Sequence, residues 1–72
     1  KMILEVKYDS EGNPVTLMTG ETDPNKDIKA RIKLLQQYKR QGYTHVKDKF
    51  WIMLTGKLAT INDYIRETKS YL

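Results

Sequence analysis

The chain has 72 residues, with 13 Lys and Arg against 9 Asp and Glu, a single His and no Cys. A chain of this length supports one small core, so residues 1–72 are expected to fold as a single domain. Without cysteine, neither disulfide bonds nor a thiolate zinc site supplements that core, which favours a reducing compartment such as the cytoplasm. The longest apolar run, residues 50–54, is too short to span a bilayer, so no membrane segment is expected.

The positive charge is concentrated in the middle of the chain. Residues 1–25 carry three more acidic than basic side chains, residues 26–57 carry seven more basic than acidic ones, and residues 58–72 are balanced. The net charge of +4 therefore hides one strongly basic segment. A segment of this kind is typical of a surface that attracts nucleic acid or another acidic partner.

The N-terminal residues are predicted to form a β-hairpin. Lys1 precedes Met2, which suggests that Met2 is the natural first residue and that Lys1 was added to it. Apolar side chains alternate with polar ones over residues 2–8, which predicts a half-buried strand. Turn-forming residues follow, and a second short strand is predicted over residues 15–19. The short connection would make the two strands antiparallel neighbours.

The clearest element is a long helix over residues 24–41. Asp23 before Pro24 is typical of an N-cap and a first helical residue, because the carboxylate accepts a free backbone N–H and proline has none there. Gly42 is suited to end the helix. At 100° per residue the apolar side chains share one broad face, and four cations share an arc of about 60° on the other side. These cations are Lys26, Lys29, Lys33 and Arg40.

Residues 43–54 are rich in aromatic and β-branched side chains and are predicted to be strand. The alternation of apolar and polar side chains is interrupted at residues 47–49. The segment is therefore either one long strand with a bulge or a second hairpin that turns at Asp48 and Lys49. The absence of glycine at that turn disfavours the hairpin. On a strand, Trp51 and Met53 would share one face, and an exposed pair there would mark a binding surface.

A second helix is predicted at the C-terminal end of the chain, with its apolar residues on one face between Leu58 and Leu72. Its start lies between Gly56 and Thr60, because Thr60 followed three residues later by an acidic side chain resembles a weak capping box. Its polar side is balanced in charge, so it is interpreted as a packing helix. The elements together predict a small single-domain α+β fold of order ββαβ(β)α.

The sequence contains no evident set of residues for catalysis or for metal binding. His45 is the only histidine, and acid–base catalysis needs a positioned partner for it. Acidic pairs such as Asp9 with Glu11 lie in a predicted turn, where they are common for backbone reasons. We therefore expect a protein that is not an enzyme, with no cofactor and no metal site.

Binding is the expected function, and nucleic acid is the first candidate partner. Cations about one helical turn apart can reach successive phosphates of DNA or RNA. The following strand would add two lysines to this surface, with aromatic side chains between them to stack on bases. Lysine is also a good helix former on a plain solvated face, and the sequence leaves that alternative open. The expected nucleic-acid-binding residues are Lys26, Lys29, Lys33, Arg40, Lys47 and Lys49.

The alternative function is a protein-interaction or inhibitor module that docks on an acidic partner. Its interface would be the exposed edge of the sheet or a face that includes Tyr43, Trp51 and Met53. A protein this small gains stability by assembly, so self-association as a homodimer belongs to this alternative. Either function suits a small cytoplasmic accessory protein that binds without chemistry.

Overall fold

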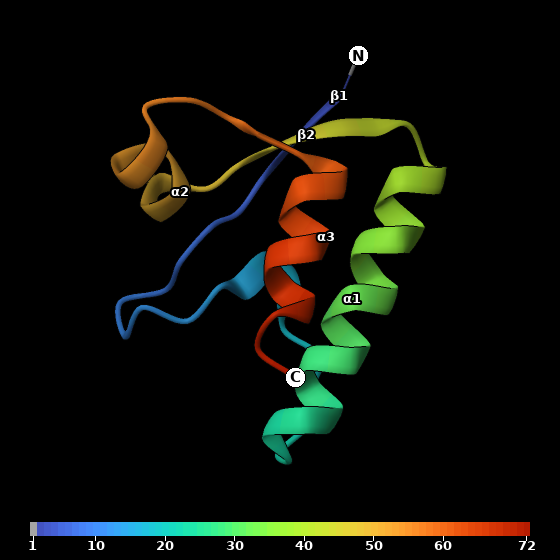
Figure 1. Ribbon diagram of the computed structural model, residues 1–72. Coiled ribbons are helices and arrows are strands. Elements are labelled where there is room, and N and C mark those ends of the chain that lie inside the picture. The colour runs from blue at the N-terminus through green and yellow to red at the C-terminus, as the bar shows by residue number, and fades with distance from the viewer. Residues whose placement is uncertain (1) are drawn as a thin grey trace.

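Within residues 2–72, the protein consists of three short strands, three α-helices and one turn of 3-10 helix (Figure 1). In chain order these are β1 (Met2–Glu5), η1 (Val15–Leu17), α1 (Pro24–Arg40), β2 (Tyr43–Lys47), α2 (Lys49–Thr55), β3 (Ala59–Thr60) and α3 (Ile61–Lys69). The structure is a computed structural model that describes residues 2–72. Lys1 lies outside the described residues, so the prediction that it precedes a natural first residue stays a prediction.

The three strands form one mixed sheet in the order β1-β2-β3. β1 runs parallel to β2, with Ile3 opposite His45 and Leu4 opposite Val46, whereas β3 runs antiparallel to β2. Parallel neighbours need a crossover connection, which here contains α1. α1 and α3 lie side by side across one face of the sheet (Figure 1). The predicted α+β class is confirmed.

The core lies between the two long helices and this face of the sheet. Leu4 of β1 and Val46 of β2 are buried together with Ile32 and Leu35 of α1. The apolar face that helical periodicity predicts for α1 is therefore its packed face. Because side chains alternate along a strand, Lys47 lies on the sheet face opposite to Val46 and away from the helices.

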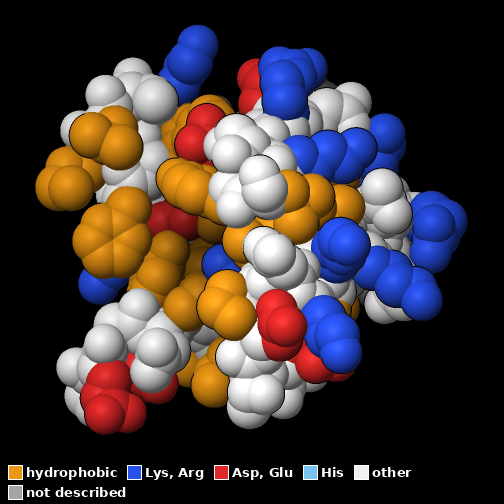
Figure 2. Space-filling view, turned by 60° about the horizontal axis from the view of Figure 1, so that its bottom comes forward, with side chains coloured by type: hydrophobic (Ala, Val, Ile, Leu, Met, Phe, Trp, Pro, Cys, Tyr) orange, Lys and Arg blue, Asp and Glu red, His pale blue; other side chains and the backbone are white. Residues whose placement is uncertain are grey.

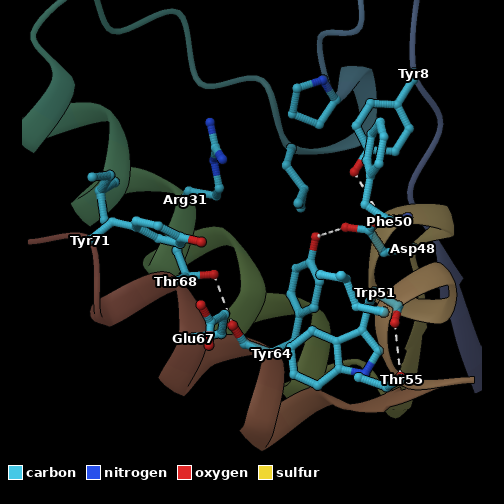
Figure 3. Close-up of a pocket in the computed structure, with 14 residues that line it drawn as sticks. Tyr8, Arg31, Asp48, Phe50, Trp51, Thr55, Tyr64, Glu67, Thr68 and Tyr71 are labelled. Atoms are coloured by element: carbon cyan, nitrogen blue, oxygen red, sulfur yellow. Dashed lines mark hydrogen bonds between the residues drawn. The ribbon is translucent and has the colours of Figure 1, made fainter. Parts of the chain in front are cut away.

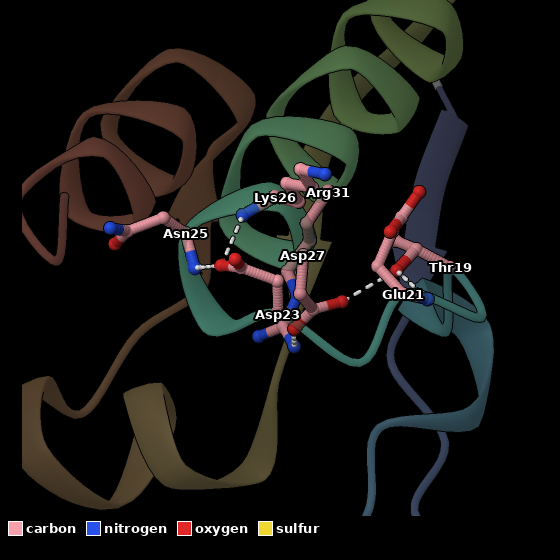
Figure 4. A network of polar contacts seen from close by, with 7 residues as sticks. All are labelled: Thr19, Glu21, Asp23, Asn25, Lys26, Asp27 and Arg31. Carbon is pink, nitrogen blue, oxygen red and sulfur yellow. Dashed lines mark hydrogen bonds and ion pairs between the residues drawn. The ribbon is translucent and has the colours of Figure 1, made fainter.

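α1 begins and ends within one residue of the predicted positions. The Asp23 carboxylate accepts hydrogen bonds from the backbone N–H groups of Asn25 and Lys26, at 2.9 and 3.3 Å (Figure 4). The last helical residue is Arg40. Gly42, with a φ of 108°, adopts the left-handed conformation that leads the chain into β2.

α3 begins at the later of the two predicted positions. The Thr60 hydroxyl accepts a hydrogen bond from the backbone N–H of Asp63 at 3.1 Å, so this threonine is the N-cap. The two residues of β3 pair with β2 directly before α3. This third strand is too short to leave a pattern in the sequence.

The predicted N-terminal hairpin forms only as a single antiparallel bridge between Tyr8 and Pro14, and its predicted second strand over residues 15–19 is wrong. Residues 15–17 form the 3-10 turn η1, and β1 pairs with β2. The chain does reverse, because Asp9 Oδ1 accepts hydrogen bonds from the backbone N–H groups two and four residues later. However, Pro14 has no N–H to donate to a ladder. The Thr16 side chain also accepts the Lys7 N–H at 2.9 Å, where a continued hairpin would place a backbone carbonyl.

The predicted strand over residues 43–54 is wrong beyond residue 47. β2 ends there and α2 follows, so neither the bulged strand nor the second hairpin forms. The Asp48 carboxylate caps α2 by accepting the Phe50 N–H at 2.9 Å, and Gly56, with a φ of 77°, ends it. None of the seven residues of α2 is fully buried. Although α2 is apolar, no helix within residues 2–72 is long and apolar enough to cross a membrane.

Candidate binding surfaces

The outer face of α1 carries four exposed cations, and we call this set the α1 stripe. The stripe runs over about 21 Å of the helix axis, given a rise of about 1.5 Å per residue. None of its members forms an ion pair within the part of the chain that the structure describes. Lys and Arg side chains gather on the side of the molecule that α1 occupies (Figure 2). The α1 stripe consists of Lys26, Lys29, Lys33 and Arg40.

The one acidic residue of α1, Asp27, does not neutralise this stripe. It lies on the other side of the helix, where Arg31 Nη2 is 3.0 Å from Asp27 Oδ2 (Figure 4). The Thr19 hydroxyl donates a second hydrogen bond, of 2.5 Å, to Asp27 Oδ1. These contacts tie the start of α1 to the loop before it, and among the described residues they leave the cations of the α1 stripe outside any ion pair.

The six cations that the sequence groups into one nucleic-acid surface lie in two places. Lys47 is on the sheet face opposite α1, and Lys49 is the first residue of α2. Lys49 Nζ lies 5.1 Å from the ring centroid of Tyr8 and 5.2 Å from that of Phe50. The sequence does not predict this division, because it depends on which face of the sheet α1 packs against and on which face each side chain of the sheet lies. That these residues bind nucleic acid stays a prediction.

The interface predicted from Tyr43, Trp51 and Met53 does not form as one face. The Tyr43 ring packs edge-on against Tyr38, with 5.4 Å between ring centroids. Trp51 turns inward to Tyr64, at 5.9 Å between centroids, and its indole Nε1 is buried without a hydrogen-bond partner among the described residues. Only Met53 is exposed, because α2 is a helix and residues two positions apart are about 200° apart around its axis.

A groove with a volume of about 700 Å³ separates α2 from the two long helices (Figure 3). Its apolar lining comes from α2, from α1 and from the segment around η1, and includes Leu17, Ile28 and Leu54. Figure 2 shows hydrophobic side chains gathered around a hollow on this side of the molecule. Asp48, Tyr8 and Tyr64 lie among the polar residues of its lining.

A buried carboxylate is the centre of a polar cluster in this lining. Asp48 is 6% exposed and accepts hydrogen bonds from the Tyr8 hydroxyl at 2.8 Å and the Tyr64 hydroxyl at 2.5 Å (Figure 3). Burial, and then the hydrogen bond to Asp48, raises the pKa of both tyrosines above the ordinary value of 10.0. The cluster joins the N-terminal segment, α2 and α3. The sequence indicates only the two ends of α2, where Asp48 precedes Gly56 by eight residues.

A second hollow, of about 680 Å³, lies on the other side of α2 and faces the end of β1; we call it the lysine hollow. Its charged lining contains three lysines and one acid, Glu5. Glu5 is opposite Lys47 in the strand register, but no ion pair joins them. Lys7 was not among the predicted binding residues, which all come from the basic segment of residues 26–57. The lysines are Lys7, Lys47 and Lys49, and the apolar lining includes Val6, Ile52 and Met53.

The described residues contain no cluster of three or more His, Asp or Glu side chains that would hold a metal ion. His45 lies on β2 with its Nδ1 2.9 Å from the Thr44 hydroxyl, and no carboxylate within residues 2–72 is hydrogen-bonded to it. A histidine without such a partner lacks the arrangement that general acid–base catalysis requires.

The chain matches no protein-family model, no curated protein and no solved structure. Its function is inferred from the α1 stripe, the groove and the lysine hollow. The first and last of these carry cations that form no ion pair among the described residues. In the groove, Asp48 pairs with Tyr8 and Tyr64, but the buried Arg31 Nε and Trp51 Nε1 have no hydrogen-bond partner within residues 2–72.

Proposed function

We propose that the protein binds nucleic acid through the α1 stripe, without chemistry and in the cytoplasm. The observation that supports this best is the presence of four exposed cations on one helix face, with no carboxylate paired to any of them within residues 2–72. Lysines that approach phosphates release the counterions condensed on DNA or RNA, and this release drives association. The absence of cysteine suits a reducing compartment.

The α1 stripe is suited to contact phosphates rather than to read a sequence. The ammonium group of lysine is a compact charge that contacts phosphate oxygens, and three of the four members are lysines. Gln36 and Gln37 are exposed on the same side of α1, and their amides are of a kind that contacts base edges. We therefore expect strong dependence on salt and weak dependence on base sequence.

Charge reversal in matched pairs tests this proposal. Lys29→Glu with Lys33→Glu alters the α1 stripe, whereas Lys7→Glu with Lys47→Glu changes the net charge equally at the lysine hollow. Binding is measured by fluorescence anisotropy with a labelled DNA duplex, a DNA single strand and an RNA hairpin, at low salt. We expect the first pair to weaken binding by about tenfold or more and the second pair by much less.

Two outcomes would reject the proposal. One is that the wild-type protein binds none of the three probes at low salt. The other is that both pairs weaken binding equally, because binding would then follow net charge and not the α1 stripe. Circular dichroism of both variants confirms that the fold is intact before affinities are compared.

A further inference from the structure

α2 presents large apolar side chains to solvent. Phe50, Met53 and Leu54 are 46%, 73% and 82% exposed, and they belong to a helix of seven residues in which nothing is fully buried. An isolated helix of this length is not stable in water, and exposed apolar side chains concentrated on one element mark an interaction site. The two flanks of α2 differ, because Leu54 borders the groove and Met53 borders the lysine hollow.

The lysine hollow combines this apolar surface with unpaired positive charge. Ile52 and Met53 of α2 supply the apolar surface, and Lys7, Lys47 and Lys49 line the same hollow. Within residues 2–72 none of the three ammonium groups forms an ion pair. A complementary occupant carries apolar groups at its centre and negative charge at its edge.

We propose that the lysine hollow is the docking site for an acidic segment of another protein. An apolar side chain of that segment packs against Ile52 and Met53, and carboxylates on either side of it meet the three lysines. Methionine is flexible and polarizable, so Met53 adapts to the shape of the inserted side chain. This inference goes beyond nucleic-acid binding, because the lysine hollow and the α1 stripe lie on opposite faces of the sheet.

The geometry favours a protein segment over a nucleic acid at this place. The aromatic rings beside the lysine hollow belong to Tyr8 and Phe50, which pack edge-on with 5.0 Å between their centroids. Lys49 Nζ lies over both rings, at 5.1 and 5.2 Å from their centroids. A base would have to displace this ammonium group in order to stack, whereas an apolar side chain entering beside Met53 leaves it in position.

The charges also argue against a second copy of this chain. A twofold symmetric contact would place the same surface on both sides, so the lysines of one copy would face those of the other. Glu5 is the only acidic side chain in the lining, and it does not balance three lysines. An acidic partner removes this repulsion and adds favourable pairing.

Selection from random peptides tests the inference directly. A display library of peptides about twelve residues long is selected on the full-length protein. We expect the enriched sequences to share an apolar residue flanked by two or more Asp or Glu. The strongest peptide is then synthesised with a fluorescent label, and its affinity is measured by anisotropy at low and at high salt.

Variants of the protein then locate the site. Met53→Ser and the pair Lys7→Glu with Lys47→Glu are each expected to weaken binding of the peptide by about tenfold or more. The pair Lys29→Glu with Lys33→Glu alters only the α1 stripe and is expected to leave the affinity within about twofold. All the substituted side chains are exposed, and thermal unfolding of each variant checks that the fold is retained.

Several outcomes would overturn the inference. No enrichment, or enriched peptides without acidic residues, would exclude an acidic segment as the occupant. Equal binding to the wild type and to Met53→Ser would place the peptide elsewhere. Sedimentation of the wild type as a dimer that Met53→Ser dissociates would assign the surface to a second copy. Binding to vesicles containing anionic lipid, with loss in the same variants, would assign it to a lipid surface. None of these results depends on whether the α1 stripe binds nucleic acid.

Discussion

The hydroxyl of Tyr64 donates a hydrogen bond of 2.5 Å to Asp48 Oδ2, and this bond links α3 to the residue that caps α2. Tyr8 donates to the other carboxylate oxygen from the N-terminal segment. The same carboxylate accepts the Phe50 N–H. One buried side chain thus helps to fix the position of a helix in which no residue is fully buried and which contacts the core through Trp51.

Replacing Asp48 should release α2. Asp48→Ala removes the N-cap and leaves two buried hydroxyls without their acceptor, so we expect the free energy of unfolding to fall by about 3 kcal/mol. Urea denaturation followed by circular dichroism measures the loss. Asp63→Ala is the control, because its ion pair with Arg66 is largely exposed and contributes no more than about 1 kcal/mol. Similar losses in the two variants would contradict the central role of Asp48.

The raised pKa of Tyr64 predicts a loss of stability at alkaline pH. Burial and the hydrogen bond to Asp48 keep its proton on the folded protein, whereas the unfolded chain releases that proton above the ordinary value of 10.0. This contribution is fully present below about pH 10 and is lost as the pH rises further. Tyr64→Phe should be less stable than the wild type at about pH 8 and should lose less of its remaining stability above about pH 10. The free energy of unfolding of both proteins is measured by urea denaturation from about pH 8 to about pH 11. An equal loss in the two proteins above about pH 10 would disprove the contribution of Tyr64.

Gly56 should tolerate few replacements, for reasons of backbone conformation alone. Its φ is 77°, and a Cβ added there would meet no atom within 4 Å. Gly56→Ala therefore introduces no steric clash with the rest of the protein, and we expect it to cost about 1 kcal/mol through the left-handed conformation. Gly56→Asn should cost less, because asparagine tolerates this conformation better. Thermal unfolding of both variants measures the difference, and an alanine variant as stable as the wild type would refute the assignment.

Nucleic-acid binding should weaken with salt in proportion to the contacts that the α1 stripe makes. If all four cations meet phosphates of a DNA duplex, the logarithm of the association constant should fall with the logarithm of salt concentration with a slope of about −3.6. Lys33→Gln should reduce the magnitude of this slope by about one, whereas Lys47→Gln should leave it nearly unchanged. Titrations at several salt concentrations give the slope, and an equal change in the two variants would count against the assignment of the surface.

The two long helices could be predicted from the sequence because their determinants are local. Asp23 and Thr60 cap helices within three residues of themselves, and the apolar face of α1 follows from spacing along one segment. The pairing of β1 could not be predicted in this way. Its partner β2 lies beyond α1 in the chain, and a plausible turn at residues 9–14 suggested a nearer partner.

α2 shows where local preference failed for a physical reason. An aromatic and β-branched run normally favours a strand, but Asp48 begins a helix here, and its burial is stabilised by Tyr8 and Tyr64 from distant parts of the chain. The N-cap and Gly56 were both visible in the sequence. Their effect depended on hydroxyl donors whose position only the folded protein determines.

The sequence by itself determined that the positive charge lies in residues 26–57 and that four cations share one face of α1, because helical spacing alone sets that arrangement. The tertiary structure decided which other cations join them. Lys47 points to the face opposite α1, since its neighbour Val46 fills the core, and parallel pairing brings Lys7 to the same side. The cations of the basic segment therefore lie on two separate surfaces, the α1 stripe and the lysine hollow. The sequence pattern alone does not predict this division.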